Sequence, residues 1–454
     1  SRGLGDVYKR QLVFSYVGMT SQEIPLKGKT KVEVVMEDDA QALEEVVVIG
    51  YGSVKRKDLT GSVATVNSEV LAAVPVASAT EALQGKMAGV QITTTEGSPD
   101  AEMKIRVRGG GSITGDNTPL FIVDGFPVES ISDIPASDIE DMTVLKDASS
   151  TAIYGSRGAN GVMLVTTKKG QENTKATINV SLEASYFRPI NVPKFADGAT
   201  YMRAYNEAEQ ARSLTPITSP KYSEDQILNT ELGTNPYVYP DVDWFDQIFR
   251  SGNYNQRANV NVSGGGSRVT YYMSLQANHD TGLLDAPDYF YNPNINQWQY
   301  NFQNNISYKL TNTTTIDLRM MAQIGNLQGP NYNIGNDLYK RVMRANPVEF
   351  PAYFPQQEGD DGFIRFGGGE IKPGVLGTNP YEYMMSSFKE VNFNTLNTSL
   401  ALNQDLSVIT KGLSLKALVN FKNWSETSYT RNIKSNIYLS LIHISEPTRR
   451  SYIS

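Results

Sequence analysis

Three carboxylates lie close together in the sequence, at Asp138, Asp141 and Asp147, and paired carboxylates are one arrangement that can carry out acid–base catalysis. Carboxylates beside short helices, however, usually cap the helix or face solvent. The chain has no cysteine and only two histidines, His279 and His443, so thiolate nucleophiles, zinc–thiolate sites and histidine-based triads lack support. We therefore predict that the protein is not an enzyme and that it holds no cofactor and no metal ion.

The two ends of the chain are related at the level of DNA. The peptides SRGLGDVYKRQ at Ser1–Gln11 and LSLIHISEPTR at Leu439–Arg449 can be encoded by one DNA string and its reverse complement, and that string resembles a transposase-type sequencing adapter. We therefore predict that residues 1–11 and 439–454 are derived from an adapter; an inverted terminal repeat in the gene is the alternative. The natural sequence would then be part of a longer protein, and the lack of a signal peptide carries no information about export.

The composition bounds the class of protein. A chain of 454 residues has room for about two or three domains. No run of about 18 apolar residues occurs, which excludes a transmembrane helix but not a transmembrane β-barrel, whose strands alternate. A mean hydropathy of −0.35 with 25 tyrosines and 16 phenylalanines suits such a barrel and equally a soluble β protein. The net charge of −7 and the lack of a basic stripe argue against nucleic-acid binding.

Apolar and polar residues alternate through most of the second half of the chain, for example in Val269–Ala277, Ile316–Ile324 and Leu413–Phe421. These runs have about the length that a tilted strand needs to cross hydrocarbon. One apolar and one strongly polar face predict lipid on one side and a wet lumen on the other. A soluble β-sandwich alternates in the same way with its apolar face inward, and the period alone does not choose between them. A short turn at Gly264–Ser267 beside a long insertion at Gly325–Glu390 favours the barrel.

The segment before this region has a mixed pattern of helices and strands. Phe121–Val128 predicts a hairpin, because its Asp124-Gly125 pair supplies the positive φ that a type I′ turn requires. Ser137–Met142 predicts a helical turn, and Ala148–Tyr154 predicts a short helix ended by a glycine. The pattern is typical of a separate α+β domain.

A short β-branched segment stands ahead of this mixed domain. Glu44–Gly52 reads EEVVVIGYG, four aliphatic residues between two glutamates and a glycine stop. Such a segment can add to the edge of another protein's sheet, where backbone hydrogen bonds supply the affinity. An ordinary buried strand is the alternative.

Three segments together resemble the SusC/RagA family of TonB-dependent outer-membrane transporters: EEVVVIGYG at Glu44–Gly52, PLFIVDGFPVE at Pro119–Glu129, and LKDASSTAIYGSRGANGVMLVTTKKG at Leu145–Gly170. They occur in the family's order and spacing. Further on, Asp241–Arg250 and Asn259–Leu284 resemble the first barrel strands of that family.

The resemblance implies a β-rich fold class: the end of a small β-sandwich domain, an α+β plug domain, and the first strands of an incomplete transmembrane antiparallel β-barrel. Family barrels have about 22 strands, and this chain offers about seven to nine, so we expect that its barrel does not close and that the chain does not fold unaided. The implied divisions are the C-terminal part of a carboxypeptidase-regulatory-like β domain with its linker at 12–43, a TonB box at 44–52, the plug at 53–172 and the partial barrel at 173–438.

Functional residues can be carried over position by position. The segment that would contact TonB comprises Glu44, Glu45, Val46, Val47, Val48, Ile49 and Gly50. Asp124 and Gly125 would form the plug hairpin, and Gly155, Gly158 and Gly161 would shape the turn before the last plug strand. No substrate-binding residue can be assigned in this way.

The resemblance also implies a function and partners. Such a protein would lie in the outer membrane, in contact with its lipid, and import oligosaccharides, glycans or peptides. It would work with a SusD-like surface lipoprotein and with TonB and its inner-membrane energising complex. Two alternatives remain open: a TonB-dependent receptor for siderophores or cobalamin, and a soluble β-sandwich binding protein or adhesin.

Overall fold

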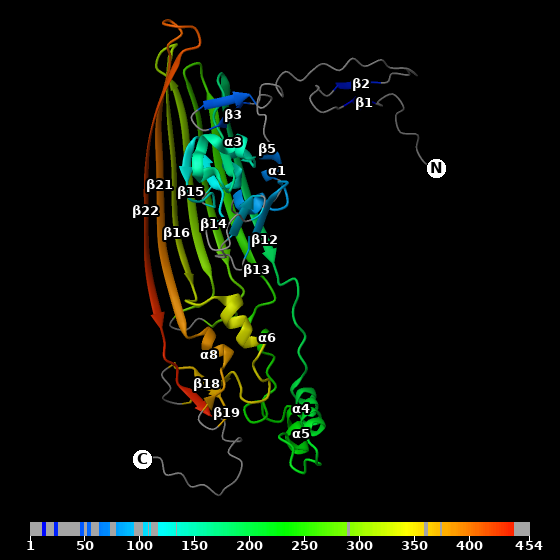
Figure 1. The fold of residues 1–454 in the computed structure, drawn as a ribbon. Coiled ribbons are helices and arrows are strands. Elements are labelled where there is room, and N and C mark those ends of the chain that lie inside the picture. Colours follow the sequence, from blue (N-terminus) through cyan, green and yellow to red (C-terminus); the bar gives the residue numbers. More distant parts are fainter. Residues whose placement is uncertain are drawn as a thin grey trace, which may run out of the picture. The chain divides into compact units, whose positions relative to one another are not determined.

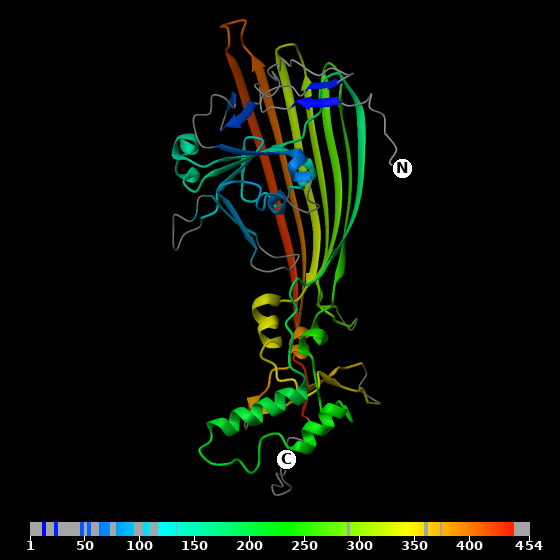
Figure 2. The same cartoon turned by 90° about the vertical axis from the view of Figure 1, so that its right-hand side faces the viewer.

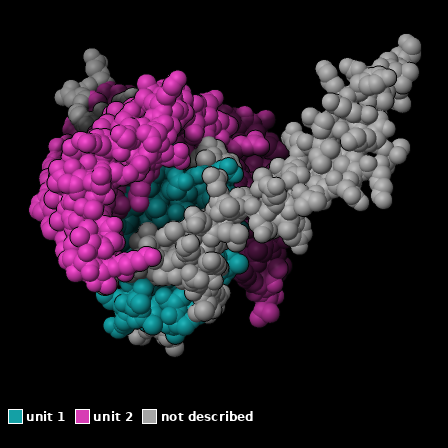
Figure 3. Space-filling model, turned by 90° about the horizontal axis from the view of Figure 1, so that it is seen from above, with its two compact units in different colours: residues 1–93, 103–168 teal, residues 94–102, 169–454 magenta. Residues whose placement is uncertain are grey.

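The computed structural model describes residues 11–14, 22–25, 46–49, 52–55, 63–72, 79–94, 103–107, 109, 117–132, 134–287, 291–357, 362–372 and 375–439. The chain divides into two compact units, coloured teal and magenta in Figure 3. Unit 1 comprises Ser1–Thr93 and Met103–Lys168, and unit 2 comprises Thr94–Glu102 and Lys169–Ser454. No helix among the described residues is long and apolar enough to cross a bilayer.

Unit 1 is built on a five-stranded sheet. Its strands in spatial order are β5 (Val63–Asn67), β10 (Ile139–Leu145), β11 (Val162–Thr167), β8 (Leu120–Val123) and β9 (Phe126–Val128). Neighbouring strands are antiparallel except β11 and β8, which are parallel. Ile122, Leu145 and Val162 come from three of these strands and pack together in the core.

Short helices flank the sheet of unit 1. They are α1 (Ser68–Ala72), α2 (Ala79–Ala82), η4 (Ala136–Asp138), α3 (Ala148–Thr151) and η5 (Ala152–Gly158). A separate two-stranded sheet is formed by β6 (Val90–Thr94) and β7 (Met103–Val107). The helical turn expected at Ser137–Met142 was wrong beyond Asp138. The residues that follow enter β10, because Ile139 and Met142 are fully buried in a strand that pairs on both sides.

Two further hairpins are described in unit 1. In one, β1 (Gln11–Phe14) pairs with β2 (Gln22–Pro25), and in the other, β3 (Val46–Ile49) pairs with β4 (Gly52–Lys55). The rest of the expected β domain at 12–43 lies outside the described residues.

Unit 2 contains a seven-stranded antiparallel sheet in which every strand pairs with its neighbours in chain order (Figure 1). The strands are β12 (Thr174–Phe187), β13 (Asn253–Gly265), β14 (Val269–Thr281), β15 (Asn296–Lys309), β16 (Thr314–Gly329), β21 (Ser387–Asp405) and β22 (Ser414–Asn432). Each strand has 13 to 19 residues. Figure 2 shows the sheet curved along its width, as a section of a barrel wall would be.

The two faces of this sheet differ in chemistry, as the alternation predicts. On one face the aliphatic side chains are open to the surroundings: Leu182 is 79% exposed, Ile324 61% and Val419 69%. On the other face asparagine, glutamine and serine hydrogen-bond one another: Asn259 donates to Ser274 and Gln276 donates to Asn278, at 3.1 and 2.8 Å. A soluble β-sandwich would bury the aliphatic face instead, so this face contradicts the sandwich alternative.

Connections at the two ends of the sheet are unequal in length. At one end, residues 266–268, 310–313 and 406–413 join adjacent strands. At the other end lie 188–252, 282–295 and 330–386. This asymmetry is the one expected of an outer-membrane barrel.

We call residues 188–252, 330–386 and 433–439 the loop layer. Its helices are α4 (Gly198–Arg212), α5 (Glu224–Leu232), α6 (Trp244–Ile248), η6 (Ile334–Leu338), α7 (Tyr339–Val342) and α8 (Pro380–Met384). Its strands are β17 (Tyr353–Phe354), β18 (Arg365–Gly368), β19 (Glu370–Lys372), β20 (Val375–Leu376) and β23 (Ile437–Leu439). Trp244, Leu338, Phe350 and Met384 belong to one buried cluster, which makes the layer a folded structure with its own core.

Candidate functional site

The predicted plug hairpin is tied to the neighbouring sheet by one carboxylate. Asp124 and Gly125 lie between β8 and β9 with φ of 50° and 92°, the positive values of a type I′ turn. Asp124 accepts hydrogen bonds from the backbone N–H and the hydroxyl of Thr167, at 3.1 and 2.5 Å. Its own N–H donates to the Val165 carbonyl at 2.9 Å. The side chain therefore fastens the turn to the end of β11.

Three glycines shape the approach to β11, each for a different reason. Gly155 has φ 59° and ψ −144°, a conformation almost restricted to glycine. Gly158 is crowded, because a Cβ there would lie 3.0 Å from the Thr151 carbonyl oxygen. Gly161 combines both constraints: its φ is 90°, and a Cβ would lie 3.0 Å from the Val107 side chain.

The three carboxylates that suggested acid–base chemistry have structural surroundings. Asp147 is the N-cap of α3 and accepts from the Ser150 N–H at 2.8 Å. Asp138 is 1% exposed and is the last residue of η4. Asp141 lies in β10, opposite Thr166 of β11. Within the described ranges, no group of three histidine, aspartate or glutamate side chains could hold a metal ion.

The predicted TonB-contact segment is described only in part. Val46–Ile49 form β3, whereas Glu44, Glu45 and Gly50 lie outside the described residues. In the part of the chain that the structure describes, β3 pairs with β4 alone. Its other edge could therefore accept a strand from a partner.

Aromatic side chains mark the end of the sheet nearest the loop layer. The ring of His279 stacks on Trp298 with centroids 4.2 Å apart, and its Nε2 lies 2.9 Å from the Asn296 side-chain oxygen. Tyr186 and Tyr254 form a second pair, at 5.0 Å. Aromatic rows of this kind are typical of the interface between lipid and water. We therefore interpret His279 as a member of such an interfacial row.

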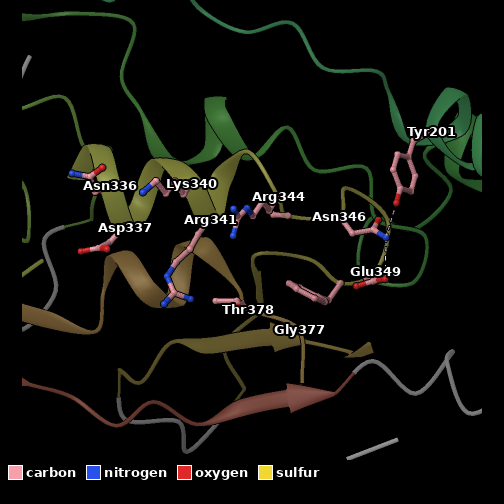
Figure 4. Close-up of a pocket in the computed structure, with 12 residues that line it drawn as sticks. Tyr201, Asn336, Asp337, Lys340, Arg341, Arg344, Asn346, Glu349, Gly377 and Thr378 are labelled. Carbon is pink, nitrogen blue, oxygen red and sulfur yellow. Dashed lines mark hydrogen bonds between the residues drawn. The ribbon is translucent and has the colours of Figure 1, made fainter. Parts of the chain in front are cut away.

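A cavity of about 550 Å³ in the loop layer is a candidate ligand site (Figure 4). Its walls come from η6, α7 and the turn after it, from α4, and from the segment after β20. The lining residues are Tyr201, Asn336, Asp337, Lys340, Arg341, Arg344, Ala345, Asn346, Glu349, Phe350, Gly377 and Thr378.

One asparagine joins the parts of this cavity wall. Asn346 donates from its amide to Glu349 at 2.9 Å and to the Tyr201 hydroxyl of α4 at 3.3 Å. Its amide oxygen accepts from the Val348 N–H, and its carbonyl accepts from the Trp244 indole, both at 2.9 Å. No sequence pattern singles out this residue as functional, because the Asn-Pro pair at 346–347 signals only a turn.

Burial changes the pKa of ionisable groups in the loop layer. Burial raises the pKa of Tyr381 to about 12, and it also raises that of Tyr332, whose hydroxyl donates to the Met384 carbonyl. Burial raises the pKa of the Glu382 carboxyl as well, against the opposing effect of the Arg341 charge. Both tyrosines therefore remain neutral at ordinary pH.

Residues 55–162 match the family described as TonB-dependent Receptor Plug Domain. Over 279 residues the chain is 41% identical to TonB-dependent receptor P26 of Formosa agariphila, which covers 60% of this chain and 26% of that protein. It is 34% identical over 287 residues to TonB-dependent receptor SusC of Bacteroides thetaiotaomicron, with 61% and 26% covered. These similarities support a TonB-dependent receptor of the SusC/RagA type.

The chain spans about a quarter of the length of the curated relatives it matches, 26% of SusC for example. A solved structure of the RagAB peptide importer in its open-open state is similar in fold, with a TM-score of 0.66, 22% identity, and 86% of this chain and 44% of that chain covered. The predicted β-rich fold class with a plug domain is confirmed, and the large antiparallel sheet of unit 2 is unclosed, as an incomplete barrel would be. The same similarities support the predicted location in the outer membrane, where TonB-dependent receptors such as SusC lie.

Proposed function

We propose that this protein takes part in TonB-dependent import of glycans or peptides across the outer membrane, with a SusD-like surface lipoprotein as its partner. The observation that carries the proposal is the combination of a plug match at 55–162 with a sheet whose aliphatic face is open. The similarity to SusC, and to a solved structure named as a peptide importer, supports large nutrients as the cargo. In such a receptor the loop layer would face the exterior, because the long connections of outer-membrane barrels are extracellular.

The described strands suggest where force from TonB would act. The segment at 44–52 would add its strand β3 to a sheet of TonB through backbone hydrogen bonds. Tension would pass along the chain to β5, the edge strand of the five-stranded sheet. An edge strand is held on one side only, here by five residue pairs with β10, so it would separate before the central strands.

The remaining predicted plug residues would keep the rest of the sheet together under this tension. Asp124 and Gly125 fasten β8 and β9 to the end of β11. Gly155, Gly158 and Gly161 let the chain turn into β11 without strain. We further propose the domain division at 12–43, 53–172 and 173–438 for the complete receptor.

A proline placed in β3 tests the proposal. Val48→Pro removes a backbone donor from the strand that would pair with TonB, whereas Val48→Ile keeps the donor and the β-branched shape. We expect uptake of labelled oligosaccharides or peptides to fall in Val48→Pro to the level of a strain without TonB, while surface binding persists. Uptake that is equal with and without TonB, or a defect restricted to iron chelates or cobalamin, would contradict the proposal.

A further inference from the structure

The cavity of the loop layer has the size of a ligand site. Its volume of about 550 Å³ lies within the range of about 300–1,000 Å³ for pockets that bind small molecules. It is formed by residues from distant parts of the chain that share the buried core around Trp244 and Phe350, which gives it stable walls. Figure 4 shows Arg341 extending from α7 toward Thr378 on the opposite wall.

Three cations line this cavity without an ion-pair partner among the described residues: Lys340, Arg341 and Arg344. Lys340 and Arg344 are exposed and one helical turn apart, so both can reach the same ligand. Arg341 is half-buried, with its guanidinium carbon 3.9 Å from the centre of the Tyr383 ring. That contact holds the guanidinium in place and leaves its hydrogen-bond donors available.

The carboxylates of the cavity are already engaged. Glu349 accepts from Asn346 at 2.9 Å and lies 3.6 Å from the Lys221 ammonium. Asp337 accepts from the Asn333 N–H at 3.1 Å, which ties it to the start of η6. Three cations against two carboxylates, one of which also pairs with Lys221, leave the cavity with a positive net charge.

The other lining groups indicate what carries the complementary negative charge. Asn336, Asn346 and Thr378 both donate and accept hydrogen bonds, as vicinal hydroxyl groups require. A peptide would instead need apolar pockets for alternate side chains, and Phe350 and Ala345 are the only aliphatic or phenyl side chains in the lining. The Tyr201 ring offers a flat surface at one end of the cavity.

We propose that this cavity binds an acidic oligosaccharide, with Arg341, Arg344 and Lys340 on a carboxylate or sulfate group of one sugar. The inference rests on the proposed function, since it assigns one class of cargo to the receptor. Guanidinium groups pair with carboxylate and sulfate oxygens through two parallel hydrogen bonds, which gives both affinity and orientation.

The test is calorimetric titration of the receptor, purified from outer membranes in detergent. The probes are tetragalacturonate, its fully methyl-esterified form, a sulfated κ-carrageenan tetrasaccharide and tetra-aspartate. We expect the acidic saccharides to bind more tightly than the ester and to weaken as salt is raised. The double substitution Lys340→Gln with Arg344→Gln should weaken acidic binding by about tenfold and leave the ester unchanged. Arg212→Gln, which removes an exposed charge of α4 outside the cavity, should have no effect.

Several results would overturn this assignment: equal binding of tetragalacturonate and its ester, no effect of the double substitution, or preference for tetra-aspartate. Whichever acidic saccharide binds more tightly identifies the carboxylate or the sulfate as the recognised group. Growth that still requires TonB while no acidic probe binds would refute the cavity assignment and leave the import function standing. Binding of an acidic probe, together with growth that does not require TonB, would support the cavity assignment and refute the import function.

Discussion

Replacing each of the three glycines before β11 by alanine separates backbone strain from crowding. Gly155→Ala adds a Cβ into open space but at φ 59° and ψ −144°, so it should cost about 1–3 kcal/mol of local stability from strain alone. Gly158→Ala has no positive φ to strain it, and its close approach to the Thr151 carbonyl should cost about 1–2 kcal/mol, since a helical alanine recovers part of the crowding penalty.

Gly161→Ala combines the two effects. A φ of 90° should cost the alanine variant about 1–2 kcal/mol of stability. Contacts of the new Cβ at 3.0 Å with Val107 and at 3.3 Å with the Leu145 carbonyl should cost about 1–3 kcal/mol more through overpacking. The sum is about 2–5 kcal/mol. Gly266→Ala in the turn between β13 and β14 is the control, because nothing lies within 4 Å of its Cβ and its φ is not positive.

Hydrogen exchange of the β11 amides in the detergent-solubilised receptor measures these local free energies. Protection should fall most in Gly161→Ala, by about 30-fold or more, since about 1.4 kcal/mol corresponds to tenfold. It should fall less in Gly155→Ala and Gly158→Ala, and remain unchanged in Gly266→Ala. Equal losses in Gly155→Ala and Gly161→Ala would refute the crowding argument, and no loss in either would refute the turn geometry.

Further predictions concern single side chains. Asp124→Ala should expose the end of β11 to exchange, whereas Asp124→Asn, which keeps an acceptor for the Thr167 N–H and tolerates a positive φ, should lose less. Burial raises the pKa of Glu382, so its contribution to stability is present below about pH 4.5 and is lost as pH rises through the folded pKa. Protection of the α8 amides should therefore fall from pH 4 to 7 in the wild type but not in Glu382→Gln. If Trp298 lies at the lipid interface, brominated lipid should quench its fluorescence. Its contribution is measured as the difference in fluorescence between the wild type and Trp298→Phe.

The sequence predicted the strands of unit 2 wherever apolar side chains alternate with polar ones, so that one face is apolar and the other polar. In β14 every second residue from Val269 to Ala277 is apolar; the strand begins with that pattern and continues past it to Thr281. In β22 the alternation covers only Leu415–Phe421, yet the strand continues to Asn432. The last residues of β22 are polar on both faces, so no period marks them as strand; they are extended because β21 pairs with them throughout.

The cavity of the loop layer could not be predicted in the same way. Lys340, Arg341 and Arg344 read as an ordinary basic stretch of a helix, which usually faces solvent. Tyr201 and Thr378, which complete the lining, are brought to them by packing between insertions that the barrel pattern does not constrain. Tertiary packing, rather than any local period, creates this site.

The positions of the aromatic residues on β15 agree with the thickness of an outer membrane. Trp298 and Tyr308 lie on the same face, and the strand rises about 3.3 Å per residue. With a tilt of about 40°, the segment between them spans about 25 Å along the membrane normal, the height of the apolar band of such barrels. At the level of Trp298, the aliphatic face gives way to the pair of Asn326 and Glu390, which hydrogen-bond at 3.0 Å across β16 and β21. Because an asparagine–glutamate pair in hydrocarbon would leave a charge without water, the strands must leave the lipid at this level. The first residues of β21 and the last residues of β22 therefore extend past the hydrocarbon, which places the loop layer in water.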